Sequence, residues 1–378
     1  MNGKNKLGQF YTTNYAYILQ NIHITTTPTT PTTTTTIIEP FCGNGDLLPY
    51  IEIETKTKGH NDNNNNLLQL ECYDIDPKHD YITRRDTLRN PPTYKDKYVI
   101  TNPPYLARNK CDEKELFDIY GVNDLYKCFI TNLIRDPPTG GILIVPLNFW
   151  SSIRKIDVEL RKQFLQQFRI LQLNIFEEKV FEDTTYTICS FQFKLLLSPT
   201  QQQQQHQINI DVYPSQTNIK VALNDENHYT IGGCIYNLSQ STITTRKYKI
   251  TRMTTKNKTQ HTTNGTNLLV KCIDDNENNR ISLTMADNYY IDETPNLSAR
   301  TYASLLIEPP INTQRQQQLA NAFNLFINEE RRKYCSLFLT NYRESKDIAR
   351  KRISFDLVYN IVGYLLEKED KEADGKGK

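Results

Sequence analysis

The stretch Val99-Ile100-Thr101-Asn102-Pro103-Pro104-Tyr105 joins an apolar segment to a rigid turn. Two consecutive prolines fix the backbone and remove two N–H donors, so a strand that precedes them cannot continue its hydrogen-bond ladder. Asn102 is therefore expected at the carboxyl end of a strand. Its side-chain carbonyl and a neighbouring backbone carbonyl are both acceptors, which together suit a planar amino group with two N–H donors. Adenine, cytosine and glutamine carry such a group, and the ring of Tyr105 offers a face on which an unpaired base can stack.

The same residues have a plainer interpretation, because Asn and Pro both favour surface turns. The order of the neighbouring motifs decides between the two. Glu39-Pro40-Phe41-Cys42-Gly43-Asn44-Gly45 is typical of a strand, a glycine turn and the start of a helix, the place where a doubly wound sheet admits a ligand. The third glycine of the dinucleotide fingerprint is missing, which favours a nucleoside over a pyrophosphate.

Two acidic residues follow this turn at the expected ends of the next elements. Asp74 ends the second predicted strand, where an acid accepts from ribose hydroxyls in Rossmann-like folds. Asp86 is suited to accept from an adenine amino group of the same ligand. Either acid alone is more often a helix cap or part of a solvated turn. Together with Asn102 and the glycine turn they predict a nucleoside site next to an amine-binding loop.

The composition is typical of a globular protein with polar tracts. Hydrophobic residues make up 38% of the 378 residues, and the mean hydropathy is -0.61. This length suffices for two domains, each with its own core. The net charge is only +2, so nucleic-acid binding requires a local basic patch.

The eight cysteines form no C-x-x-C pair and the six histidines form no ligand pattern, which predicts reduced thiols and no metal site. No apolar run is long enough to span a bilayer. We expect a cytoplasmic protein, or a nuclear or viral-factory one if the source is a eukaryote or a virus.

The motifs G-Q-F-Y-T, E-P-F-C-G-N-G, D-I-D-P, R-D and N-P-P-Y occur in this order over about the first 195 residues. In this respect the chain resembles the gamma class of S-adenosylmethionine-dependent adenine-N6 DNA methyltransferases. The resemblance implies a Rossmann-like class I methyltransferase domain, doubly wound around a mostly parallel seven-stranded sheet. It also implies S-adenosyl-L-methionine as cofactor and a flipped-out adenine of duplex DNA as substrate, in the setting of restriction and modification.

The resemblance assigns roles to individual positions. Phe10 and Thr12 would flank the cofactor, Glu39 and Gly43 would line its amino-acid end, and Asp74 would hold its ribose. Asp86 would contact its adenine. The full predicted cofactor site is Phe10, Tyr11, Thr12, Glu39, Phe41, Gly43, Gly45, Asp74, Ile75, Asp86, Thr87 and Asn102. The predicted catalytic residues are Asn102, Pro103, Pro104 and Tyr105.

Phe181 lies in a Val-Phe segment before the next predicted strand. By family likeness it would stack on the target base opposite Tyr105, and the alternative interpretation is a core phenylalanine.

The second half of the chain contains a segment in which all the charged side chains are basic. Between residues 227 and 273 there are basic residues and no acidic residue, a pattern that fits contact with a phosphate backbone or a merely solvated loop. The predicted DNA-binding residues are Arg246, Lys247, Lys249, Arg252, Lys256, Lys258 and Arg300. Helices are expected at 319–326, 331–342 and 355–367 as packing elements.

The glutamine run predicts the domain boundary. We expect a catalytic domain at 1–198, a linker at 199–207, a smaller α+β target-recognition domain at 208–368 and a disordered tail at 369–378. The expected assembly is a monomer on double-stranded DNA, with any cognate restriction endonuclease acting separately and with no membrane contact.

Three other functions fit parts of the pattern. A protein-glutamine methyltransferase uses a similar N-P-P-Y loop, but that family typically carries a substrate domain before the glycine turn, where only some 36 residues precede Ile37 here. An RNA adenine methyltransferase differs only in its acceptor. A non-catalytic DNA-binding module is disfavoured, because every position that carries the chemistry is intact.

Overall fold

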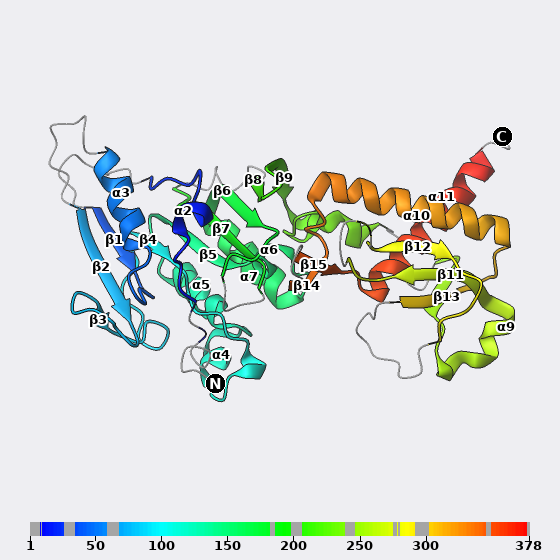
Figure 1. Cartoon of the computed structure of the whole chain (residues 1–378), viewed down its shortest axis with the longest axis horizontal. Helices are drawn as coiled ribbons and strands as arrows, with labels where there is room; N and C mark the ends of the chain where they lie inside the picture. The colour runs from blue at the N-terminus through cyan, green and yellow to red at the C-terminus, as the bar shows by residue number, and fades with distance from the viewer. Residues whose placement is uncertain are drawn as a thin grey trace. The chain divides into compact units, whose positions relative to one another are not determined.

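The computed structural model describes residues 8, 10–25, 35–58, 68–181, 186–197, 206–238, 246–274, 278, 280–291, 302–344 and 349–375. The chain divides into two compact units, Met1–Asn224 and Asp225–Lys378, and each is described by itself (Figure 1). In the described ranges, no helix combines the length and the apolar character that a membrane crossing requires.

The first unit is built on a nine-stranded sheet with the order β3-β2-β1-β4-β5-β7-β6-β8-β9. Its strands are β1 (Thr35–Glu39), β2 (Leu68–Asp74), β3 (Thr83–Arg84), β4 (Lys97–Thr101), β5 (Gly140–Pro146), β6 (Phe168–Phe176), β7 (Ile188–Leu195), β8 (His206–Tyr213) and β9 (Thr217–Leu223). The pairings from β3 to β5 are parallel, whereas β7 is antiparallel to both of its neighbours. The predicted α/β class with a mostly parallel sheet is confirmed.

The chain direction across the sheet reverses between β1 and β4. From β1 the chain moves outward to β2 and β3, then returns to β4 on the other side of β1. The carboxyl ends of β1, β2 and β4 therefore meet at a topological switch point, which is where open α/β sheets bind ligands.

The helices of the first unit bury apolar side chains against this sheet. They are α2 (Tyr15–Ile18), α3 (Leu48–Lys58), α4 (Glu115–Tyr120), α5 (Leu125–Arg135), α6 (Asn148–Ser151) and α7 (Lys155–Gln167). Phe129, Ile130 and Leu133 of α5 are fully buried, and β5 is buried along its whole length, as its apolar sequence predicts. The arrowheads of β1 and β2 point toward the side on which α4 lies (Figure 1).

Two strands more than predicted belong to the sheet. β8 pairs in parallel with β6, from Leu173 with Ile210 to Phe176 with Tyr213, and β9 pairs with β8. The alternating Ile208, Ile210 and Val212 of β8 are buried. The predicted seven strands and the predicted start of a second domain at 208 are therefore wrong, since residues 208–223 extend the first unit. The glutamine run itself, 201–205, lies outside the described residues.

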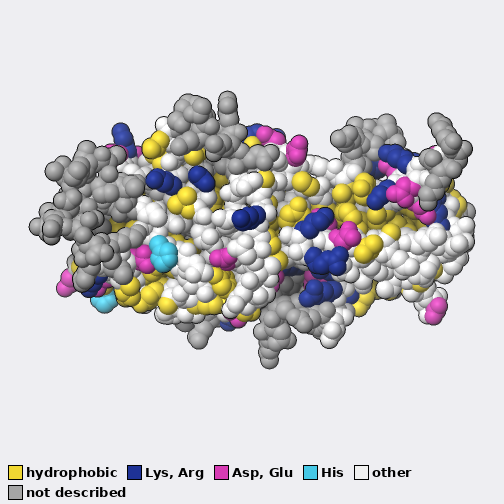
Figure 2. Space-filling view, turned by 90° about the horizontal axis from the view of Figure 1, so that it is seen from above, with side chains coloured by type: hydrophobic (Ala, Val, Ile, Leu, Met, Phe, Trp, Pro, Cys, Tyr) yellow, Lys and Arg dark blue, Asp and Glu magenta, His cyan; other side chains and the backbone are white. Residues whose placement is uncertain are grey.

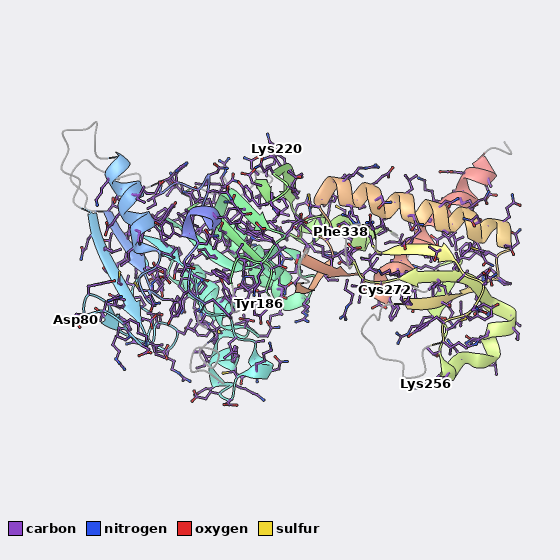
Figure 3. The ribbon with its side chains drawn as sticks, viewed as in Figure 1. Asp80, Tyr186, Lys220, Lys256, Cys272 and Phe338 are labelled. Atoms are coloured by element: carbon purple, nitrogen blue, oxygen red, sulfur yellow. The ribbon has the colours of Figure 1, made fainter. Side chains whose placement is uncertain are left out.

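The second unit has α+β architecture, as predicted. A four-stranded antiparallel sheet has the order β10-β13-β11-β12, and a two-stranded sheet pairs β14 with β15. The strands are β10 (Lys249–Arg252), β11 (Gly265–Lys271), β12 (Ser282–Met285), β13 (Tyr302–Glu308), β14 (Thr340–Glu344) and β15 (Ala349–Arg352). The helices α10 (Thr313–Tyr334) and α11 (Phe355–Gly375) share one apolar core with them, which includes Cys272 and Phe338 (Figure 3).

The carboxyl-terminal residues depart from the prediction in two ways. Helix α10 ends at Tyr334 because Cys335 has a φ of 47°, and residues 340–342, predicted as the end of a helix, belong to the strand β14. The residues 369–375, predicted as a disordered tail, continue α11. Arg315 holds this last part, since Nε lies 2.8 Å from Glu369 and Nη2 lies 2.6 Å from Asp370. Residues 376–378 lie outside the described part.

Candidate active site

Three polar side chains meet where neighbouring strands end. Glu39 is the last residue of β1, Asp74 is the last residue of β2, and Asn102 follows the last residue of β4. All three are buried, with exposed fractions of 1%, 3% and 9%. Because β1 lies between β2 and β4 in the sheet, these side chains share one edge.

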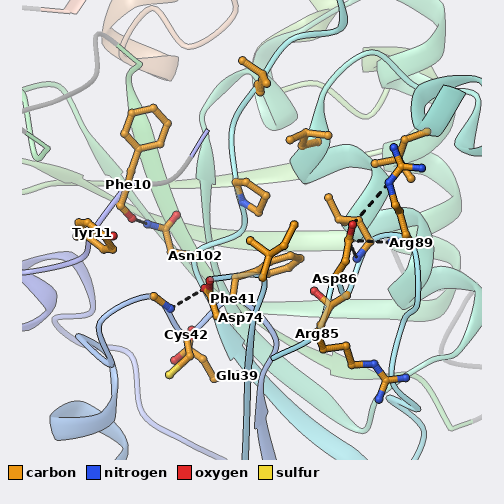
Figure 4. Close-up of a pocket in the computed structure, with 18 of the residues that line it drawn as sticks. Phe10, Tyr11, Glu39, Phe41, Cys42, Asp74, Arg85, Asp86, Arg89 and Asn102 are labelled. Atoms are coloured by element: carbon orange, nitrogen blue, oxygen red, sulfur yellow. Dashed lines mark hydrogen bonds and ion pairs between the residues drawn. The ribbon is translucent and has the colours of Figure 1, made fainter. Parts of the chain in front are cut away.

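A cavity of about 480 Å³ opens at this edge, a size in the range of small-molecule sites (Figure 4). Its walls include eleven residues of the predicted cofactor site and two of the predicted catalytic loop. Those residues are Phe10, Tyr11, Thr12, Glu39, Phe41, Gly43, Asp74, Ile75, Asp86, Thr87, Asn102 and Pro104, of which Asn102 was predicted for both roles. Gly45, Pro103, Tyr105 and Phe181 are not among the residues that line it.

The glycine turn is fixed to the end of β2. Gly43 has a φ of +56°, and its backbone N–H donates to Asp74 Oδ2 over 2.8 Å. A Cβ at this position would lie 3.0 Å from the ring of Tyr11, another residue of the cavity wall. The second carboxylate oxygen, Asp74 Oδ1, accepts from the N–H of Asp76 over 2.8 Å. Asp74 is thus oriented by two backbone donors, which keeps its carboxylate at the cavity wall.

Glu39 supplies a buried carboxyl group to the cavity. Within the described residues its Oε2 has no hydrogen-bond partner. Burial raises the pKa of Glu39 well above its usual value, and the nearby Cys72 raises it further. A buried carboxyl oxygen without a partner fits a ligand that brings an ammonium group, because such a cation would satisfy the acceptor and stabilise the charged form.

Asp86 and Thr87 form another part of the cavity wall. Asp86 Oδ1 accepts from the N–H groups of Leu88 and Arg89, over 3.1 and 3.0 Å, and Thr87 Oγ1 donates to the Pro40 carbonyl over 2.9 Å. Asp86 therefore caps its own turn, as the plainer interpretation predicted, and also faces the cavity. Its contact with a ligand's adenine stays a prediction.

The amide of Asn102 is held in one orientation. Its Nδ2 donates to the Phe10 carbonyl over 2.8 Å and to Thr12 Oγ1 over 3.0 Å (Figure 4). The Tyr105 hydroxyl donates to Asn102 Oδ1 and lies 2.7 Å from the Ile144 carbonyl. An amide oxygen has two lone pairs, so Asn102 Oδ1 retains acceptor capacity for a further donor.

Tyr105 and Phe181 are more deeply buried than a base-stacking role predicts. Tyr105 is 2% exposed and Phe181 is 5% exposed. Burial raises the pKa of Tyr105 well above its ordinary value, which keeps its hydroxyl protonated. The rings of Tyr126 and Tyr186 meet the Tyr105 ring edge-on at 6.2 and 6.1 Å.

The predicted DNA-binding residues differ in their surroundings. Lys249 and Lys256 are exposed, and Figure 3 shows Lys256 on the second unit. Others contact groups of the same unit: Arg246 donates to Asn360 over 2.8 Å, Lys247 lies 2.6 Å from Asp370, and Arg252 lies over the Phe355 ring at 4.2 Å. The side chains of Lys258 and Arg300 are outside the described part. On the face in Figure 2, basic side chains are scattered among neutral and hydrophobic ones.

The apolar end of the cavity was missed by sequence reasoning. It is lined by Leu88, Leu106, Leu116 and Leu125, which come from the loops and helices after β3 and β4. Leu106 directly follows the predicted catalytic loop, and this adjacency was the one available signal. The other leucines are separated in sequence: Leu116 lies on α4, Leu125 begins α5 and Leu88 follows β3, so only the tertiary fold brings them to one cavity.

Residues 48–181 match a protein-family model described as Eco57I restriction-modification methylase. No curated protein matches the chain. Among solved structures, the type I restriction-modification methyltransferase subunit from Streptococcus thermophilus is similar with a TM-score of 0.37 and 14% identity, over 55% of this chain and 48% of that one.

Two further structures are similar at the same level. The M protein of the type I restriction enzyme EcoKI has a TM-score of 0.35 and 13% identity, over 53% of this chain and 49% of that one. The protein of a DrdV–DNA complex has a TM-score of 0.41 and 12% identity, over 70% of this chain and 36% of that one. The chain thus covers about half or less of the length of these three proteins.

Proposed function

We propose that the chain is a site-specific DNA methyltransferase that transfers a methyl group from S-adenosyl-L-methionine to N6 of an adenine swung out of duplex DNA. The observation that carries the proposal is the position of the Asn102 amide on the same cavity as the Glu39 and Asp74 carboxyl groups. The family match over residues 48–181 supports a methylase of restriction-modification type.

The residues of the cavity fit the proposed cofactor. Glu39 offers an acceptor without a partner for the ammonium group, Asp74 offers a carboxylate for ribose hydroxyls, and the leucine-lined end offers an apolar wall for the adenine ring. Bound S-adenosylmethionine would supply a methyl group activated by its sulfonium. The chain's own residues then have only to bind, orient and exclude water.

The role of Asn102 follows from the electronic structure of an exocyclic amine. The nitrogen lone pair is delocalised into the adenine ring, so N6 is a poor nucleophile while its group is planar. Asn102 Oδ1 and the backbone carbonyl next to it would each accept one N6 hydrogen and localise the lone pair. The bound sulfonium would supply the methyl carbon to N6 and leave as the thioether, and the amine would lose one proton to water.

Asn102 is suited to this role because its orientation is fixed before a base arrives. Its Nδ2 is engaged by Phe10 and Thr12, so the amide oxygen cannot exchange places with the nitrogen without the loss of two hydrogen bonds. Pre-orientation of this kind lowers the cost of reaching the reactive geometry.

The second unit is proposed to bind and select the DNA, through exposed residues such as Lys249 and Lys256. A monomer is proposed to act on duplex DNA, separately from any partner endonuclease. In this arrangement the first unit carries out the methyl transfer, and the second unit selects the DNA sequence.

The proposal is tested by incubating the protein with labelled S-adenosylmethionine and genomic DNA, and by mapping the methylated bases. We expect N6-methyladenine at one short sequence. Asn102→Ala should bind the cofactor about as well as the wild type in calorimetry yet lose methyl transfer, while Asn209→Ala on an exposed position of β8 serves as the matched control. Full activity of Asn102→Ala, or preferential labelling of RNA in a competition with DNA, would overturn the proposal.

A further inference from the structure

The ring of Phe10 forms stacked pairs with both rings that were predicted to hold the target base. Its centroid lies 5.2 Å from that of Tyr105, with an angle of 26° between the planes. The centroid of Phe181 is 6.5 Å away, with an angle of 24°. Phe10 thus forms a stacked pair with each of two rings from segments far apart in sequence, and it is the member common to both pairs.

The backbone around Phe10 is held independently of its ring. The Phe10 carbonyl accepts from Asn102 Nδ2 over 2.8 Å, and the Gly8 carbonyl accepts from the Tyr105 N–H over 2.9 Å. A Cβ on Gly8 would lie 2.7 Å from the Tyr105 carbonyl oxygen, so only glycine permits this approach. In Figure 4 the Phe10 ring points away from Asp74 while its carbonyl faces Asn102. Rotation about the Cα–Cβ bond can thus move the ring and leave both backbone contacts in place.

We propose that the Phe10 ring occupies the place of the target base between Tyr105 and Phe181 when the protein is free of DNA, and that it rotates out when the base enters. This inference rests on the proposed function, because it requires a planar base as the alternative occupant. Two flat apolar faces with nothing between them would lose their dispersion contacts, and a phenylalanine ring supplies these contacts until a base does.

The exchange has a measurable cost for the base. A base can bind only to protein in which the Phe10 ring has left the place between Tyr105 and Phe181. The apparent affinity for the base is therefore the intrinsic affinity multiplied by the fraction of protein in which that place is empty. Removal of the ring should strengthen base binding by about tenfold, which corresponds to about 1.4 kcal/mol. A larger ring that stacks more strongly should weaken it.

The test uses free 2-aminopurine, a planar amine-bearing base whose fluorescence is quenched when it stacks. The cofactor cavity is first saturated with S-adenosylhomocysteine, and calorimetry verifies that each variant binds it. Phe10→Ala should reach half-maximal quenching at about a tenth of the wild-type concentration of 2-aminopurine, and Phe10→Trp at a higher concentration than wild type. Phe326→Ala, which removes a half-buried ring of the second unit next to Tyr364, should match the wild type.

The outcomes separate this inference from the function on which it rests. Equal quenching in all proteins, or weaker binding by Phe10→Ala, would overturn the role of Phe10 even if the wild type methylates DNA. Tighter binding by Phe10→Ala, in a protein that methylates no nucleic acid, would support the place for a planar base and refute the methyltransferase.

Discussion

The backbone N–H of Leu106 donates to Asp124 Oδ1 over 3.1 Å, and the N–H of Leu125 returns a bond to the Leu106 carbonyl over 3.2 Å. Leu106 is the first residue after the Asn-Pro-Pro-Tyr turn, and Asp124 directly precedes α5. The proposed catalytic loop is thus anchored to a helix at its carboxyl side, while Gly8 and Phe10 hold its opposite side.

Asp124 should make stability depend on pH in an unusual direction. Burial raises the pKa of this carboxyl group to about 6 from its usual 3.8, against the opposing effect of Lys127. The stabilising contribution of its protonated form is fully present below the unfolded pKa and is lost as the pH rises through about 6. Asp124→Asn, which cannot ionise, should therefore gain up to about 3 kcal/mol over wild type above pH 6, and the gain should vanish near pH 4.

Denaturant unfolding at a series of pH values measures this difference. Asp118→Asn, at an exposed position that pairs with Arg108, is the control and should show no such pH-dependent gain. Parallel stability curves for Asp124→Asn and the wild type would contradict the prediction.

Glu39 should couple cofactor binding to proton release. Since burial raises its pKa, part of the free protein carries a protonated Glu39, and an incoming ammonium group favours the carboxylate. Affinity for S-adenosylhomocysteine should rise with pH until Glu39 is ionised in the free protein, and then level off. Calorimetry in two buffers of different ionisation enthalpy measures the protons released. Glu39→Gln should bind more weakly and release fewer protons, and unchanged proton release in that variant would count against the assignment.

The buried pair of Lys127 and Asp157 should be critical for stability. Their side chains are 6% and 3% exposed and lie 2.5 Å apart, and Ser152 Oγ donates to Asp157 over 2.6 Å. Asp157→Ala leaves the Lys127 charge buried without its partner, which should cost about 3–5 kcal/mol in the free energy of unfolding. Asp118→Ala, in an exposed pair, should change it little. A small effect of Asp157→Ala would show that the cluster relaxes by admitting water.

DNA binding should depend on Lys249 and Lys256 more than on the paired basic residues. Each phosphate contact that is lost reduces the slope of log K against log salt by about 1. Lys249→Ala and Lys256→Ala should each flatten the slope, whereas Lys220→Ala on β9 of the first unit should leave it unchanged (Figure 3). A slope that is the same in all variants would remove this surface from the proposal.

Local signals predicted the polar half of the cavity. Glycines, acids and the Asn-Pro-Pro turn mark strand ends by their own conformational preferences, and parallel strands align those ends automatically. For this reason Glu39, Asp74 and Asn102 could be placed together from the sequence.

The apolar half and the burial of Tyr105 could not be predicted in the same way. They depend on which helices pack over the strand ends, and an ordinary leucine such as Leu116 carries no signal of that. The strands β8 and β9 were missed for a similar reason, because the glutamine run suggested a boundary and the pairing of β8 with β6 joins segments separated by some thirty residues.

The extension of the sheet by β8 and β9 decides where the chain can be cut or recombined. A fragment that ends at the glutamine run would leave the N–H and C=O groups of β6 from Leu173 to Phe176 without their strand partner, an open edge that invites self-association. A fragment that ends at Asn224 keeps that edge covered. An exchange of the second unit between chains of this fold is therefore expected to succeed when the junction follows β9 and to yield aggregates when it precedes β8.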